Sequence, residues 1–148
     1  MLYTMTMKKM KSKIIPALFI ILLITGCGSG HVSMGGRVTY SDNGQPLEQG
    51  TVSFQTETFQ ARGEITADGR YTIGSLGSTD GLPPGTYQVF ITGSEDIEID
   101  GDGMAIRTTH RIEPKFASPD TSDLTVTVDG STRQFDFQVN RYAPPPRR

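Results

Sequence analysis

The sequence predicts an all-β protein folded as a β-sandwich. Between residues 32 and 140, short runs rich in Val, Ile, Thr, Tyr and Phe alternate with polar residues, which is typical of strands with one buried face. Clusters of Gly, Asp, Asn and Pro separate these runs and are typical of turns. No sustained helical period follows the N-terminal segment. Two sheets packed face to face would let each alternating strand bury one side.

The first half of this region predicts four strands, over residues 34–40, 50–55, 59–66 and 70–73. Asn43-Gly44 and Asp68-Gly69 are predicted turns between them, because these residue types accept positive φ. The second half predicts further strands. They cover residues 86–92, 104–112, 124–128 and 134–140.

Residues 86–92 are expected to form a central core strand, because Tyr87, Val89 and Ile91 are apolar at alternate positions. Residues 94–103 are acidic and contain glycine, so a solvated loop or hairpin tip is expected there. Residues 113–123 contain two prolines and are expected to be irregular.

The N-terminal segment predicts a cleaved signal peptide over residues 1–26. Four lysines precede an apolar run at 14–24, which is shorter than the roughly 20 residues of a membrane span. The following Ile24-Thr25-Gly26-Cys27 resembles the lipobox of bacterial lipoproteins, in which the cysteine receives a diacylglycerol and becomes the new N-terminus. Cys27 is the only cysteine, and lipidation explains it. The alternatives are an ordinary membrane anchor or a secretory signal in which Cys27 is incidental.

These features predict the domain organisation. Cleavage before Cys27 would leave a lipidated tether at 27–33, a single domain at 34–140 and a Pro/Arg-rich disordered tail at 141–148. The residue after the cysteine is Gly28, not the aspartate that retains lipoproteins at the inner membrane in enterobacteria. The predicted location is therefore a bacterial membrane reached by export, with the outer membrane or cell surface favoured.

Charge excludes one class of partner. Residues 1–26 hold 4 of the 14 basic residues and none of the 16 acidic ones, so the processed chain would have a net charge near −6. Such a chain is repelled by phosphate backbones, and nucleic acid is not an expected partner.

Five motifs, in order, resemble carboxypeptidase regulatory-like domains. The first motif is an opening group made of GRVTY, GQPL and GTVSF over residues 36–54. The second is TADGRY at 66–71, and the third is LPPGTYQV at 82–89. The fourth combines KFASP and TSDLTVTV over 115–128, and the fifth is FDF at 135–137. The ending is similar to that of small planctomycete lipoproteins. Gly50, in place of the usual alanine, and Glu113-Pro114, in place of Ile-Pro, depart from the pattern. The resemblance implies a seven-stranded Greek-key β-sandwich of the transthyretin (prealbumin-like) type, without a catalytic site.

Catalysis is not predicted from the residues either. His31 and His110 are the only histidines, and a Gly-x-Ser-x-Gly elbow is absent. Two distant histidines and one lipidated cysteine do not supply a zinc site. We therefore expect no enzyme activity and no cofactor other than the calcium considered next.

An acidic stretch is the candidate metal site. Alternate carboxylates followed by glycine resemble the start of a calcium loop, and the ligands would be Asp96, Glu98, Asp100 and Asp102. Counting from Asp96, however, the twelfth position is Arg107 and not the glutamate that closes such a loop. The preferred interpretation is the end of a strand, with Ile97 and Ile99 facing inward and the acids outward.

The expected function is that of a membrane-anchored, non-enzymatic bacterial lipoprotein. Its β-sandwich would be an interaction or structural module of the cell envelope, binding an envelope protein or glycan. The alternative is a calcium-assisted or carbohydrate-binding adhesion module.

Overall fold

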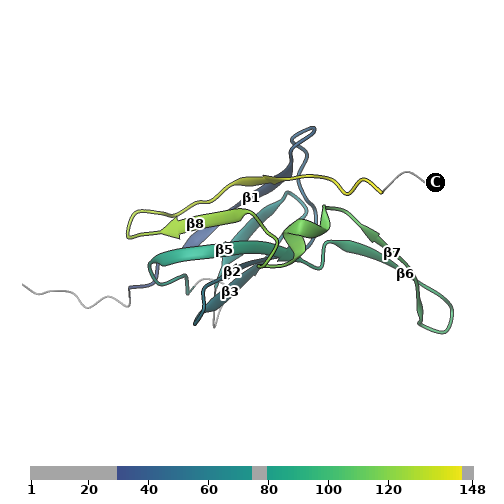
Figure 1. Cartoon of the computed structure of the whole chain (residues 1–148), viewed down its shortest axis with the longest axis horizontal. Coiled ribbons are helices and arrows are strands. Elements are labelled where there is room, and N and C mark those ends of the chain that lie inside the picture. Colours follow the sequence, from purple (N-terminus) through teal and green to yellow (C-terminus); the bar gives the residue numbers. More distant parts are fainter. Residues whose placement is uncertain (1–29, 75–79, 145–148) are drawn as a thin grey trace, which may run out of the picture.

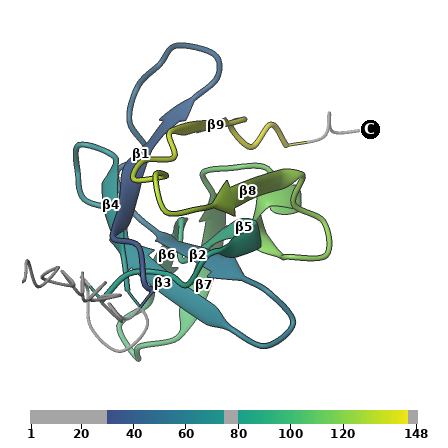
Figure 2. The same ribbon diagram turned by 90° about the vertical axis from the view of Figure 1, so that its left-hand side faces the viewer.

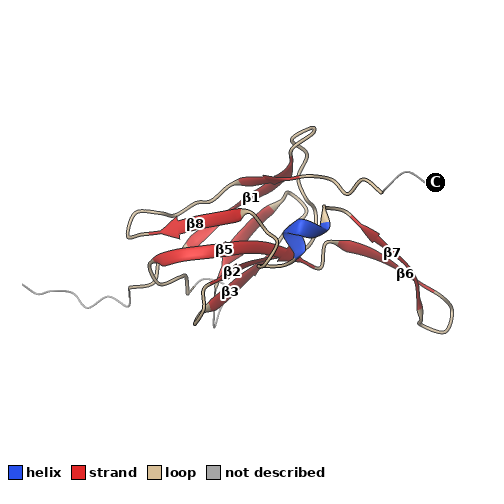
Figure 3. Ribbon diagram, in the orientation of Figure 1, coloured by secondary structure: helices blue, strands red, loops and turns tan. Residues whose placement is uncertain are grey.

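The structure, a computed structural model, describes residues 30–74 and 80–144. These residues form nine strands and one short 3-10 helix (Figures 1 and 3). The strands are β1 (Met34–Tyr40), β2 (Thr51–Gln55), β3 (Gln60–Glu64), β4 (Arg70–Ile73), β5 (Gly85–Thr92), β6 (Glu95–Ile99), β7 (Ala105–His110), β8 (Leu124–Val128) and β9 (Phe137–Val139); the helix is η1 (Pro114–Ala117).

Seven of the strands form the two sheets of a β-sandwich, which confirms the predicted fold class. One sheet has the order β4-β1-β9, in which β1 is antiparallel to β4 and parallel to β9. The other has the order β3-β2-β5-β8 and is antiparallel throughout. Figure 2 looks along the long axis and shows the first sheet above and to the left of the second.

The core lies between the two sheets and follows the alternation of the strands. In β5, Tyr87, Val89 and Ile91 are fully buried, as their alternate spacing predicts. Phe54 of β2 contacts the rings of Tyr71 and Tyr87 with centroids 6.2 Å apart. This aromatic group joins strands of both sheets.

A glycine allows β1 and the segment before β9 to approach closely. A Cβ on Gly36 would overlap the carbonyl group of Phe135. The buried Tyr71 donates a hydrogen bond from its hydroxyl to the same carbonyl oxygen. Burial raises the pKa of the Tyr71 phenol, so the side chain remains a neutral donor.

Both ends of the domain extend beyond the predicted boundaries. Residues 31–33 were assigned to the tether, but Val32 is buried and exchanges two backbone hydrogen bonds with Leu82, at 2.6 and 2.9 Å. The disordered tail was predicted to begin at residue 141. Instead, the guanidinium of Arg141 lies over the Tyr40 ring and pairs with Asp42 at 3.1 Å. The predicted tether thus ends inside the folded domain, and the predicted tail begins inside it.

The acidic stretch also differs from its prediction. Residues 95–99 form strand β6, which pairs with β7 as a separate hairpin. Ile97 and Ile99 were predicted to face inward, yet their exposed fractions are 59% and 65%. The reason is geometric. The hairpin projects from the end of the sandwich (Figure 1), so neither of its faces covers the core.

The segment between β7 and β8 is more regular than expected. Residues 114–117 form η1, with Pro114 in its first turn and Phe116 buried in the core. The proline supports this start, because the first helical residues need no intrahelical N–H donor.

Candidate functional site

The projecting hairpin holds all four predicted calcium ligands, but they make different contacts. Residues opposite each other in an antiparallel pair share a face, so Asp96 and Glu98 lie on one face with Thr109 and Arg107. Asp96 forms a bidentate pair with Arg111, whose Nη2 and Nε lie 2.8 and 3.1 Å from its carboxylate oxygens. This hydrogen bond raises the pKa of Arg111.

The remaining acids lie farther along β6 and at the tip of the hairpin. Glu98 lies 3.8 Å from Arg107, and both side chains are largely exposed. Asp100 accepts hydrogen bonds from the backbone N–H groups of Asp102 and Met104, at 3.0 and 2.8 Å, and so closes the tip. Among residues 30–74 and 80–144, no group of three or more His, Cys, Asp or Glu could hold a metal ion.

The other face of the hairpin is aliphatic, which sequence reasoning missed. Ile97 and Ile99 oppose Thr108 and Ala105, and alternation from Arg107 places Ile106 on the same face. A β-bulge after Glu98 accommodates this extra residue in β7. The alternation of acids and isoleucines indicated two unlike faces. It did not show that the aliphatic face would be exposed to solvent instead of packing against the core.

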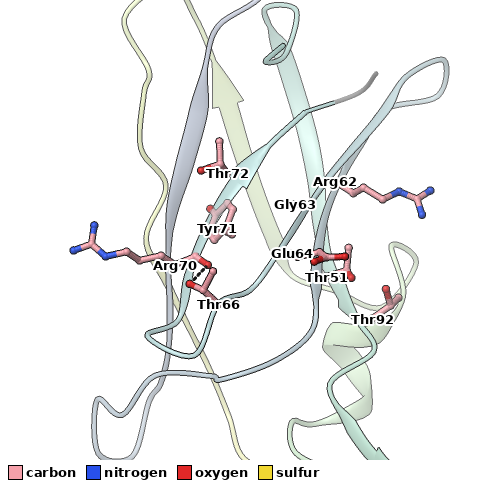
Figure 4. A pocket seen from close by; sticks show the side chains of 9 residues that line it. All are labelled: Thr51, Arg62, Gly63, Glu64, Thr66, Arg70, Tyr71, Thr72 and Thr92. Carbon is pink, nitrogen blue, oxygen red and sulfur yellow. Dashed lines mark hydrogen bonds between the residues drawn. The ribbon is translucent and has the colours of Figure 1, made fainter. Parts of the chain in front are cut away.

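A cleft of about 660 Å³ opens along the edge strands β3 and β4 (Figure 4). Its lining comprises Thr51, Arg62, Gly63, Glu64, Thr66, Arg70, Tyr71, Thr72 and Thr92. In Figure 4, the guanidinium groups of Arg62 and Arg70 point in opposite directions, away from the centre. Arg70 pairs instead with Asp68 at 3.0 Å, while the Thr66 hydroxyl lies 3.0 Å from the Arg70 carbonyl oxygen. The cleft therefore offers hydroxyl groups, but no converging pair of cations for an anion.

Both histidines lie outside this cleft. The His31 ring packs edge-on against Phe59, and its Nδ1 is 3.3 Å from the carbonyl oxygen of Asp80. The His110 ring packs against Tyr142 at a centroid distance of 5.4 Å. Each histidine thus makes an aromatic contact at the edge of the domain.

The predicted lipid attachment residue, Cys27, and the predicted signal peptide at 1–26 lie outside the described residues. Within the described ranges, no helix is long and apolar enough to cross a membrane.

Comparison with known proteins gives no family assignment. No protein-family profile matches the chain. Over 108 aligned residues, it is 28% identical to the minor capsid protein L2 of bovine papillomavirus type 3; the alignment covers 66% of this chain and 21% of the capsid protein. A 9R-lipoxygenase from Cyanothece PCC8801 superposes with a TM-score of 0.36 at 16% identity, over 74% of this chain and 16% of the lipoxygenase. The chain thus spans about a fifth of the length of the capsid protein that it matches.

Proposed function

We propose that this protein is a membrane-anchored, non-enzymatic bacterial lipoprotein whose β-sandwich acts as an interaction module in the cell envelope. The observation that supports it best is the hairpin of β6 and β7, which projects from the sandwich and exposes an aliphatic face. Exposed aliphatic patches on otherwise polar domains are typical of binding surfaces. The lipobox-like motif before Cys27 supports the anchor.

The position of the domain boundary supports a close approach to the membrane. Because Val32 is already paired with Leu82, a lipidated Cys27 would be linked to the sandwich by four residues only. Four extended residues span at most about 14 Å. The end of the sandwich near residue 30 would then lie at the lipid surface. The hairpin lies at the opposite end of the long axis (Figure 1), so it would be the part farthest from the membrane.

The motif order supports assignment to the carboxypeptidase regulatory-like domains, in which such a sandwich acts as a folding or docking module. The two sheets with seven strands are compatible with this assignment. The proposed partner is an envelope protein or glycan, and the negative charge of the processed chain opposes nucleic acid.

The anchor is tested by Cys27→Ser in a bacterial host, with Ser29→Ala as the matched control two residues away. We expect the Cys27→Ser chain to leave the membrane fraction or to accumulate as an uncut precursor, and the control to behave as the unsubstituted chain. Mass spectrometry of the N-terminal peptide should show a diacylglycerol on Cys27. Intact processing and unchanged membrane partition of the Cys27→Ser chain would contradict the proposal.

A further inference from the structure

The outer face of the sheet β4-β1-β9 carries a polar depression of about 490 Å³. Met34 and Val38 of β1 are buried, so alternation places Gly35 and Arg37 on the outer face. Gly35 has no side chain and leaves the sheet hollow at this point. The charged and polar side chains at the depression include Arg37, Arg70, Thr72, Arg133, Gln134 and Asp136.

Three arginines approach this depression from three segments of the chain. Arg37 of β1 and Arg70 of β4 lie directly opposite each other, and both side chains are exposed. Arg70 also borders the β3–β4 cleft, but its guanidinium points away from that cleft (Figure 4). Arg133 lies beside β1, because its carbonyl oxygen accepts the Gly35 N–H. Like charges directly opposite each other destabilise a strand pair, so an anion bound between them would be stabilising.

The contacts of these arginines leave donors for a ligand. The carboxylate of Asp68 accepts the Nε–H of Arg70 at 3.0 Å, and its backbone carbonyl oxygen accepts the Nε–H of Arg37 at 2.9 Å. Arg133 donates from Nη1 to the carbonyl oxygen of Thr132. Among the described residues, the Nη2 group of each arginine makes no hydrogen bond, so each can still donate.

The charge of the depression differs from that of the domain. Among the described residues that line it are three arginines and one carboxylate, that of Asp136. This carboxylate accepts the backbone N–H of Arg37 at 2.8 Å and the side-chain amide of Gln134. The depression is therefore positive, although the processed chain has a net negative charge. It complements a ligand that carries anionic groups.

We propose that this depression binds the carboxylate groups of an acidic polysaccharide. The planar guanidinium of arginine matches a carboxylate through two parallel hydrogen bonds. Thr72 and Gln134 add a hydroxyl and an amide, which can exchange hydrogen bonds with sugar hydroxyls. A glycan is one of the partners of the proposed function, and the inference rests on that function only for its location in the cell envelope.

Two other polyanions fit the depression less well. Binding to a lipid surface is strengthened by apolar side chains that enter it, but the described lining is polar and its aromatic residue, Tyr71, is buried. The same burial removes the ring on which a base of a single-stranded nucleic acid would stack. Carboxylate-bearing sugars need neither feature.

Calorimetry with the full chain as purified tests the proposal. The probe is oligogalacturonate, a chain of sugars that carry carboxylates, and a galacto-oligosaccharide is the uncharged control. We expect the acidic probe alone to bind, with an affinity that falls as the salt concentration rises, because salt screens charge pairs. Equal binding of both sugars, or binding of neither, would overturn the proposal.

Substitutions distinguish the site from the net charge. Arg37→Gln and Arg133→Gln should each weaken binding of oligogalacturonate by roughly three- to tenfold, because each removes charge-assisted hydrogen bonds. Asp136→Asn should strengthen binding by roughly two- to threefold, because it removes a repelling carboxylate. Arg62→Gln is the matched control, since it removes the same charge from an exposed side chain of β3 outside the depression. Equal weakening by Arg62→Gln would contradict the proposal.

Amide chemical shifts locate the bound sugar independently of the variants. Oligogalacturonate should shift the resonances of Gly35, Gly36 and Gln134 more than those of β6 and β7. Larger shifts in the hairpin, or tighter binding to anionic phospholipid vesicles or single-stranded DNA, would overturn the proposal. All substituted positions are exposed, so the variants should keep the unsubstituted melting curve. Because binding is measured on purified protein, failure of this site and failure of the anchor at Cys27 remain separate results.

Discussion

Gly36 illustrates how a single position decides whether a strand can approach its neighbour. Its role is not to form a turn, since its φ is not among the positive values found at Gly44, Gly50 and Gly69. It leaves space for the carbonyl group of Phe135, which also accepts the hydrogen bond from Tyr71. The sequence motif contains this glycine, but only the three-dimensional contact explains it.

We expect Gly36→Ala to lower the free energy of unfolding by about 1–3 kcal/mol, because the new methyl group meets backbone atoms that cannot rotate away. Gly101→Ala is the matched control, since a Cβ at Gly101 meets nothing within 4 Å. Urea denaturation followed by circular dichroism would measure both. Equal changes in the two variants would show that the crowding at Gly36 is relieved by local movement.

Asp129 organises the turn after β8 through its carboxylate. The hydroxyl and amide groups of Ser131, followed by those of Thr132, donate to its Oδ1 at distances of 2.7 to 2.9 Å. These hydrogen bonds lower the pKa of Asp129 well below its ordinary value. The folded-state pKa is thus below the unfolded one, so the stabilisation is present above the unfolded pKa and is lost as pH falls toward the folded value.

Replacing Asp129 with Ala should therefore destabilise the protein at neutral pH more than in strong acid. Urea midpoints for the unsubstituted chain and Asp129→Ala would be compared at neutral pH and at several steps below pH ~4, the ordinary aspartate value. The two midpoints should converge as the pH falls. A difference that is constant with pH would mean that the turn depends on the shape of the side chain and not on its charge.

At the scale of elements, alternation was sufficient to predict the bounds of several strands that cover the core. The strands at 34–40, 70–73 and 124–128 have the predicted bounds, because their apolar residues lie on one buried face. The hairpin shows where this reasoning ends. β6 has the same alternation, but its aliphatic face meets solvent, and a sequence pattern does not specify what lies opposite a face.

The ends of the domain show a second limit of prediction from the sequence. The sequence predicts a lipidated tether at residues 27–33 and a Pro/Arg-rich disordered tail at residues 141–148, both outside the domain. Val32 and Arg141 nevertheless contact residues 50 and 99 positions away, Leu82 and Asp42. Composition describes local preference, whereas these contacts depend on which distant segments the sheets bring together.

The hairpin contacts also predict the response to calcium. Asp96 is engaged with Arg111, and Asp100 accepts two backbone N–H groups, so collecting the acids around an ion would break existing hydrogen bonds. We expect millimolar calcium to leave the melting temperature unchanged, with magnesium as the control for ionic strength. Stabilisation by calcium alone would indicate that the tip rearranges to bind the ion.

At the scale of the whole molecule, the hairpin and the sandwich have separate roles. The core includes residues from both sheets and from η1, whereas no residue of β6 or β7 belongs to it. The hairpin lies at the end of the long axis opposite the N-terminal end of the described chain (Figure 1). The sandwich thus supplies stability, and the hairpin supplies an accessible surface.

This separation predicts that the hairpin can be removed without unfolding the domain. Glu95 and His110 lie opposite each other, so an Asn-Gly turn could replace residues 96–109. The deletion removes the partly exposed Asp96–Arg111 pair but no core side chain. We expect it to lower the free energy of unfolding by less than about 1 kcal/mol.

Ile91→Ala provides the contrast, because Ile91 is fully buried in β5 and its truncation should cost about 2–5 kcal/mol. Both variants would be measured by urea denaturation. If the deletion costs as much as Ile91→Ala or abolishes the cooperative transition, the hairpin supports the fold itself. If the deletion variant remains stable, the contribution of the hairpin to binding can be measured in a domain that still folds. Any binding lost in it could then be attributed to the hairpin.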